Sequence, residues 1–294
     1  MTLRFAIKKI EDECEPVVAP LRGQPASARP WEGSRQWKGR NVTAIIPVLA
    51  HSPLLELAIE SLLLQDEQPF IILVDTGSVE PEPIEALRTR NQIDVISVRS
   101  SGWRHPSQCI SAGLDAAWGC VQTPFAYYSH DDVILKRRDL ISEMVGLVKT
   151  KSPVVGYQIS PREYEGWASE VGHTCLAVDV KRMDEIGATW NLRGFATITG
   201  ESLDPAYSMA GRVDTERHFN MKLRQAGINP HFIGHERNYE RTNDANLDHC
   251  RSRTSGLLYS PTHSAKAAKW EADAITQARL RHSGELRQGA RTGR

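Results

Sequence analysis

Residues 42–48 read Val42-Thr43-Ala44-Ile45-Ile46-Pro47-Val48, and this stretch decides the fold of the chain. A nearly continuous run of β-branched and apolar residues is typical of a strand that is buried on both faces. Ser52 is a suitable N-cap for a helix that begins at Pro53, and apolar residues recur after it with helical spacing. The chain therefore enters its regular part through a strand followed by a helix.

The same alternation continues along the chain. Further strands are predicted at residues 70–74, 93–98 and 125–129, separated by helices near 84–90 and 109–118. Strands that alternate with helices imply right-handed crossovers, which place neighbouring strands parallel. We therefore predict an α/β domain with a mostly parallel sheet flanked by helices. For the less regular second half we expect a strand at 176–178, a helix at 214–226, a strand at 228–233 and a last helix at about 264–280.

Two adjacent carboxylates follow the fourth predicted strand, in the stretch Tyr127-Tyr128-Ser129-His130-Asp131-Asp132-Val133-Ile134. Open α/β sheets bind their ligands at the carboxyl ends of their strands, which is where this pair falls. Carboxylate oxygens suit Mg²⁺ or Mn²⁺, and these ions suit the phosphates of a nucleotide. A solvated loop between a strand and a helix is the alternative.

Composition excludes several classes of protein. The 294 residues carry 36 Lys and Arg against 36 Asp and Glu, so net charge gives no argument for nucleic acid or membrane as partner. The five cysteines show no C-x-x-C spacing, which argues against a zinc site or a disulfide framework. The first residues do not form a signal peptide, and no apolar run approaches the roughly 20 residues that span a bilayer. We therefore expect a cytoplasmic protein.

The segment after the first strand excludes several nucleotide-binding classes. Residues 47–53 contain no Gly, Lys or Arg, so neither G-x-G-x-x-G nor a phosphate-cradling loop is present. A Rossmann dehydrogenase, a P-loop ATPase and a nucleotidyltransferase with a basic, Gly-rich loop are thus disfavoured.

Taken in order over residues 42–240, four stretches resemble inverting glycosyltransferases of the large family-two group, which have the GT-A fold. They are Thr43–Val48, Leu73–Ser78, Tyr128–Asp132 and Thr215–Gly227. The resemblance implies a GT-A (Rossmann-like) domain at 41–250, with a nucleotide-binding half at 41–135 and an acceptor half at 136–250. An irregular N-terminal extension (1–40) and a C-terminal helical, basic tail (251–294) flank it.

The resemblance also implies an activity. A hexosyltransferase-like enzyme of this group moves a sugar from a nucleoside diphosphate sugar, here a UDP-sugar by preference, to an acceptor hydroxyl with inversion. Mn²⁺ or Mg²⁺ is the implied cofactor, because charge builds on the departing diphosphate. The acceptor, whether glycan, small molecule, protein or modified nucleic acid, stays open.

Individual residues take their roles from the same resemblance. Glu216 falls at the position of the catalytic base, with Asp214 beside it. Asp131 matches the last Asp of the metal-binding D-x-D motif, with Asp132 in support and His235 as the candidate metal-binding histidine. The residues implied to contact the nucleotide sugar are Pro47, Asp75, Gly77, Ser78, Arg104, His130 and Asp131.

Each role has a structural alternative. Asp75 can serve as a turn residue before Gly77, and acidic residues at 214 and 216 can simply stabilise a helix N-terminus. Ser129 and Thr76 stand where relatives carry aspartates. A non-catalytic nucleotide-sugar or glycan-binding relative with an eroded metal site is therefore the second functional hypothesis.

Overall fold

The computed structural model describes residues 39–48, 51–76, 78, 80–98, 106–159, 170–191, 215–236, 241–250 and 268–279, and of 106–109 it describes the backbone. Three predicted site residues, Gly77, Arg104 and Asp214, lie outside these ranges, as do residues 1–38 and most of the tail. The predicted domain boundaries stay predictions.

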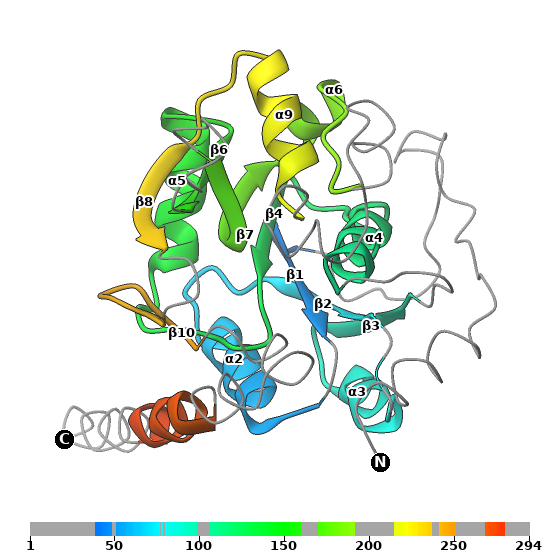
Figure 1. Ribbon diagram of the computed structural model, residues 1–294, viewed down its shortest axis with the longest axis vertical. Helices are drawn as coiled ribbons and strands as arrows, with labels where there is room; N and C mark the ends of the chain where they lie inside the picture. Colours follow the sequence, from blue (N-terminus) through cyan, green and yellow to red (C-terminus); the bar gives the residue numbers. More distant parts are fainter. Residues whose placement is uncertain are drawn as a thin grey trace.

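The described residues form a seven-stranded sheet in the order β3-β2-β1-β4-β7-β6-β8. Its strands are β1 (Val42–Val48), β2 (Phe70–Asp75), β3 (Ile93–Ser97), β4 (Phe125–Ser129), β6 (Val154–Ile159), β7 (Glu170–Asp179) and β8 (His231–Glu236). Within this sheet β7 runs antiparallel to its neighbours β4 and β6, and every other neighbouring pair is parallel. The predicted α/β class with a mostly parallel sheet is confirmed (Figure 1).

Helices cover both faces of the sheet. One face carries α2 (Pro53–Leu63), α3 (Glu82–Ala86) and α5 (Leu140–Thr150), and the other carries α4 (Pro106–Trp118), α6 (Val180–Glu185) and α9 (Arg217–Gln225). All residues of β1 and β2 are buried as a result, which explains their continuous apolar sequences. The predicted start of α2 is confirmed, since Ser52 Oγ accepts a hydrogen bond from the Leu55 N–H at 3.1 Å.

A second, antiparallel sheet lies beside the first, in the order β5-β10-β9. Its strands are β5 (Val133–Leu135), β9 (Thr242–Asn243) and β10 (Leu247–His249). The helix at 268–279 packs against it through Ala274 and Ala278, and Arg241 pairs with both Asp248 of β10 and Asp273 of this helix. His249, at the end of β10, pairs with Val133, the first residue of β5. The end of β10 therefore lies next to the turn between β4 and β5.

Several boundaries differ from the sequence-based prediction. The predicted helix at 84–90 is α3 followed by the 3-10 helix η2 (Leu87–Thr89), and β7 extends well beyond 176–178. The helix expected from residue 214 is α9, which begins at Arg217 because Thr215 and Glu216 form a turn before it. The strand expected at 228–233 begins at His231, since Gly227 ends α9 with φ +67° and Pro230 favours an extended link. The second-half elements α5 and β6 are not among those expected.

None of the helices in the described ranges has both the length and the apolar composition needed to cross a membrane.

Candidate active site

The carboxyl ends of β1 and β2 are joined at one edge of the main sheet. Thr76 donates to the Val48 carbonyl from its backbone N–H at 2.9 Å and from Oγ1 at 3.0 Å. Asp75 is buried, and its Oδ1 accepts a hydrogen bond from the Ser78 N–H at 2.7 Å. This local contact is of the kind that the turn interpretation of Asp75 requires. Pro47 is buried in β1 beside this edge.

The two adjacent carboxylates lie in the turn between β4 and β5. Asp131 is half-buried, whereas Asp132 is only 4% exposed. The backbone carbonyl of Asp132 accepts a hydrogen bond from the Cys250 N–H at 3.2 Å. This bond holds the end of β10, and with it His249, against the turn.

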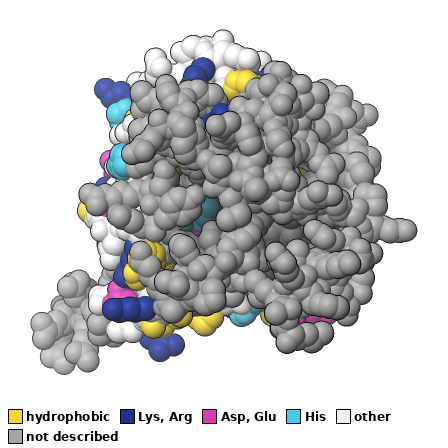
Figure 2. Space-filling model, in the orientation of Figure 1, with side chains coloured by type: hydrophobic (Ala, Val, Ile, Leu, Met, Phe, Trp, Pro, Cys, Tyr) yellow, Lys and Arg dark blue, Asp and Glu magenta, His cyan; other side chains and the backbone are white. Residues whose placement is uncertain are grey.

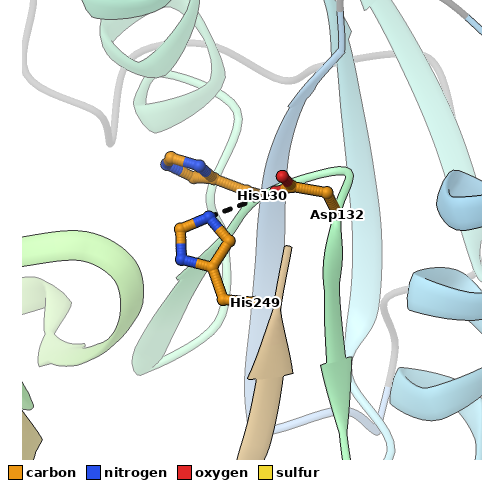
Figure 3. A group of neighbouring side chains, drawn as sticks. All are labelled: His130, Asp132 and His249. Carbon is orange, nitrogen blue, oxygen red and sulfur yellow. Dashed lines mark ion pairs between the residues drawn. The ribbon is translucent and has the colours of Figure 1, made fainter. Parts of the chain in front are cut away.

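His130, Asp132 and His249 form a compact group at this point. Each offers one ligand atom, and the three atoms lie within 4.8 Å of one another. His249 Nε2 is 3.3 Å from Asp132 Oδ1. Figure 3 shows the three side chains converging from the turn after β4 and from the end of β10. Residues more than a hundred positions apart thus meet in one buried cluster.

A further carboxylate lies on the far side of His249. Glu236, at the end of β8, is fully buried, and its Oε1 is 3.6 Å from His249 Nδ1. The same carboxylate accepts a hydrogen bond from Thr174 Oγ1 on β7 at 3.3 Å. His249 therefore lies between two carboxylates, with Nε2 toward Asp132 and Nδ1 toward Glu236. An acidic group on the outer nitrogen is the usual way in which a metal-binding histidine is oriented.

The two histidines of the group differ in charge. Burial alone lowers the pKa of His249, but the carboxylates of Asp132 and Glu236 outweigh it and raise that pKa to about 9. Burial lowers the pKa of His130 well below its usual range, and the imidazoles of His173 and His249 lower it further. At neutral pH both ring nitrogens of His249 therefore carry a proton and each faces a carboxylate, while His130 is neutral.

This donor set fits a divalent metal ion. Imidazole nitrogens and a carboxylate oxygen are ligands that first-row divalent ions accept. His130 Nε2 is buried and has no hydrogen-bond partner among the described residues. Since buried polar atoms are normally satisfied, this nitrogen is an available ligand. An ion held here would displace one of the two ring protons of His249.

Glu216 lies next to this group, at the N-terminus of α9. Its Oε1 is 2.6 Å from Nδ1 of His173 on β7, and both side chains are largely buried. The His173 ring contacts the His130 ring, with centroids 4.3 Å apart. The Glu216–His173 pair and the His130–Asp132–His249 group thus form one continuous site. In Figure 2 a histidine and an acidic side chain are visible in a hollow near the centre of this face.

The structure brings only some of the predicted site residues together. His130, Asp132 and Glu216 converge in the site, while Asp75, Ser78 and Pro47 lie where β1 and β2 end. Asp131 lies between His130 and Asp132 in the chain, but the three ligand atoms that converge belong to His130, Asp132 and His249. His235 is exposed on β8 and is not part of the group.

Three site residues are absent from the sequence-based prediction: His173, Glu236 and His249. For His173 the signal was available, because Gly172-His173 falls in the expected acceptor region of the chain. His249 ends a strand of three residues, which is too short to show a period-2 pattern.

No family model and no curated protein matches the sequence. Solved structures to which this chain shows some similarity include the mannosyltransferase PcManGT from Pyrobaculum calidifontis in complex with GDP-Man and Mn²⁺. That match has 15% identity and a TM-score of 0.48, and covers 99% of this chain and 87% of that one. S. aureus TarS 1–349 matches at 11% identity and a TM-score of 0.45 over 70% of this chain, and 59% of the TarS chain is covered. Glucosyl-3-phosphoglycerate synthase from Mycobacterium tuberculosis with UDP matches at 14% identity and a TM-score of 0.45, covering 79% and 80% of the two chains.

Proposed function

We propose that this protein is a metal-dependent glycosyltransferase that moves a sugar from a nucleoside diphosphate sugar to an acceptor hydroxyl with inversion. One observation carries the proposal. A largely buried group of metal-ligand type (His130, Asp132 and His249) lies beside the largely buried Glu216 at the carboxyl edge of a mostly parallel sheet. Two of the four sequence stretches that resemble family-two glycosyltransferases contribute to this site: Tyr128–Asp132 supplies His130 and Asp132, and Thr215–Gly227 supplies Glu216.

His130, Asp132 and His249 are the residues that would hold the metal. When bound, the ion supplies positive charge that stabilises the departing diphosphate. Two imidazoles in the donor set favour Mn²⁺ over Mg²⁺, because Mg²⁺ prefers oxygen ligands. Asp131, in the same turn, is proposed to contact the nucleotide sugar, and Glu236 is proposed to orient His249 through Nδ1.

Glu216 is the proposed base. As the acceptor oxygen bonds to the anomeric carbon, the bond from that carbon to the diphosphate breaks, and the acceptor proton passes to the Glu216 carboxylate. Asp214, Gly77 and Arg104 keep the roles that the resemblance implies, as do Pro47, Asp75 and Ser78 at the ends of β1 and β2. The preference for a UDP-sugar and a cytoplasmic location likewise stay predictions.

A donor screen tests the function. UDP-, GDP- and other nucleoside diphosphate sugars are incubated with the protein and Mn²⁺, and release of the nucleotide is measured with and without candidate acceptors. Glu216→Gln should lower release by roughly 10²–10⁴-fold, the usual contribution of a general base, while binding of the nucleotide is kept. Glu185→Gln is the matched control, since Glu185 is exposed on α6 and pairs with Arg182. Undiminished turnover by Glu216→Gln would refute the assignment of the base.

A non-catalytic binder of nucleotide sugars is the second candidate. The observation in its favour is Ser129, which is buried and stands in place of the first Asp of D-x-D. Calorimetry of UDP with and without Mn²⁺ separates the two functions. Binding that ignores Mn²⁺, together with no nucleotide release from any donor, selects the binder.

A further inference from the structure

The contact between His173 and Glu216 is short and shielded from solvent. Nδ1 and Oε1 lie 2.6 Å apart, and the side chains are 6% and 14% exposed. A general base acts as a carboxylate, which only accepts hydrogen bonds, so in the proposed reaction Nδ1 of His173 is the donor in this contact. Hydrogen bonds to an ionised group in such surroundings are about twice as strong as neutral ones, so this contact fixes the rotamer of Glu216.

His173 is itself held in place from two sides. Its ring contacts His130 on one side and lies 5.6 Å, centroid to centroid, from the Trp190 ring at an interplanar angle of 60°. Trp190 is buried and stacks on Phe219 of α9, with centroids 4.3 Å apart and an angle of 6°. The imidazole therefore has little freedom to turn away from Glu216.

The backbones that carry the two residues are also joined. Asn220 of α9 donates from Nδ2 to the Val171 carbonyl at 2.9 Å, and its Oδ1 accepts from the Val171 N–H at 3.0 Å. The same Nδ2 donates to the Glu216 carbonyl at 3.0 Å. One buried amide thus fastens the start of α9 to β7, two residues before His173. The relative position of His173 and Glu216 is fixed before any substrate arrives.

We infer that His173 is a positioning residue for Glu216: it occupies one carboxylate oxygen through Nδ1 and thereby directs the other oxygen to the acceptor hydroxyl. The inference rests on the proposed transfer reaction. In that reaction the acceptor O–H bond breaks, its proton goes to the second oxygen of Glu216, and its electron pair forms the bond to the anomeric carbon. The diphosphate leaves with the electron pair of the broken glycosidic bond.

Two substitutions of His173 separate positioning from simple packing. The amide nitrogen of Asn takes the place of Nδ1, whereas the longer Gln side chain places its amide near Nε2. His173→Asn should therefore keep most of kcat, while His173→Gln and His173→Phe should lower kcat by about 10²-fold, the cost of a misplaced catalytic group. KM for the donor should not change, because the contact with Glu216 does not depend on the nucleotide. His231→Asn and His231→Gln, at the opposite end of β8 from Glu236, are the matched controls.

A double mutant tests whether the loss of kcat depends on Glu216, which a purely structural effect of His173 would not. In the Glu216→Gln background, His173→Phe should cause no further loss of kcat, because residues that act as one unit are not additive. Nucleotide binding and thermal unfolding are measured on each variant to confirm that it is folded. Wild-type turnover in His173→Phe, equal losses in His173→Asn and His173→Gln, or additive losses in the double mutant would each overturn the inference. Failure of the proposed function looks different: the wild-type protein then releases no nucleotide from any donor, and the inference falls with it.

Discussion

Metal binding at the His130–Asp132–His249 group should release one proton and depend on pH accordingly. In the metal-free protein the pKa of His249 is raised to about 9, so below that pH the ion competes with a proton. His130 is already neutral, because burial lowers its pKa well below the usual range. One proton per ion corresponds to a gain in apparent Mn²⁺ affinity of about tenfold per pH unit between roughly pH 7 and 8.5.

The same shift affects the stability of the metal-free protein. A histidine whose pKa is raised on folding contributes stability that is fully present below the unfolded value and is lost as pH rises through the folded value. For His249 this window runs from 6.5 to about 9. At about 1.4 kcal/mol per pH unit, the loss across the window is about 3 kcal/mol. The metal-free protein should therefore unfold at a lower urea concentration at pH 9 than at pH 6.5, and saturating Mn²⁺ should reduce this difference.

Calorimetry of Mn²⁺ binding measures the proton directly. Titrations at pH 7.5 in two buffers with different ionisation enthalpies give the number of protons released, and titrations from pH 7 to 8.5 give the slope. His235→Gln should behave as wild type, since that histidine is exposed on β8. An affinity that stays constant from pH 7 to 8.5, with no proton released, would show that His249 is not the group that the ion displaces.

Two further substitution pairs test the site and its framework. His249→Ala should abolish measurable Mn²⁺ binding, whereas His235→Ala should leave Mn²⁺ binding unchanged. Both are measured by calorimetry. Loss of binding in His235→Ala alone would show that His235 is the ligand. Gly156→Ala should destabilise the fold by about 1–3 kcal/mol, because a Cβ there meets the Cys175 carbonyl at 2.9 Å. Gly146→Ala, on the exposed side of α5 with open space around it, should instead stabilise by about 0.5–1 kcal/mol in urea unfolding.

The sequence predicts the first half of the fold well because burial on both faces leaves a clear pattern. β1 and β2 have no solvent-facing side, so their apolar residues run without interruption. Ser52 marks the following helix start equally clearly. The reversed strand β7 is different, since no local pattern states that a strand pairs antiparallel to its neighbours.

The candidate site is predictable only where its residues belong to one of these patterned segments. Asp132 lies in the turn that follows β4, and Glu216 precedes a helix that is ended by Gly227. His249 has no such context, because its strand is three residues long and its partner Asp132 lies far away in sequence. A residue of this kind is found through its tertiary contacts and not through spacing.

An irregularity in β7 accounts for the way in which His173 enters the site. In a regular strand, residues four positions apart point to the same face. Val171 and Cys175 nevertheless belong to the clusters on opposite faces of the sheet. The pairing with β6 shows why, since its register shifts between Gly156 and Gln158. The extra residues are on β7, and they break the regular alternation of its side chains between the two faces of the sheet. Such bulges are frequent beside functional sites.

The close approach of β6 and β7 at the bulge requires glycine at positions 156 and 172. A Cβ at Gly172 would lie 2.8 Å from the Ile159 side chain, in addition to the close approach at Gly156. The backbones of β6 and β7 can therefore adopt this arrangement only where a side chain is missing. Because β7 runs antiparallel to β4, the irregular segment falls just beyond Ser129, at the edge where the parallel strands end. The bulge in the antiparallel strand β7 thus places His173 next to Glu216. The end of β10 places His249 at the same edge of the sheet.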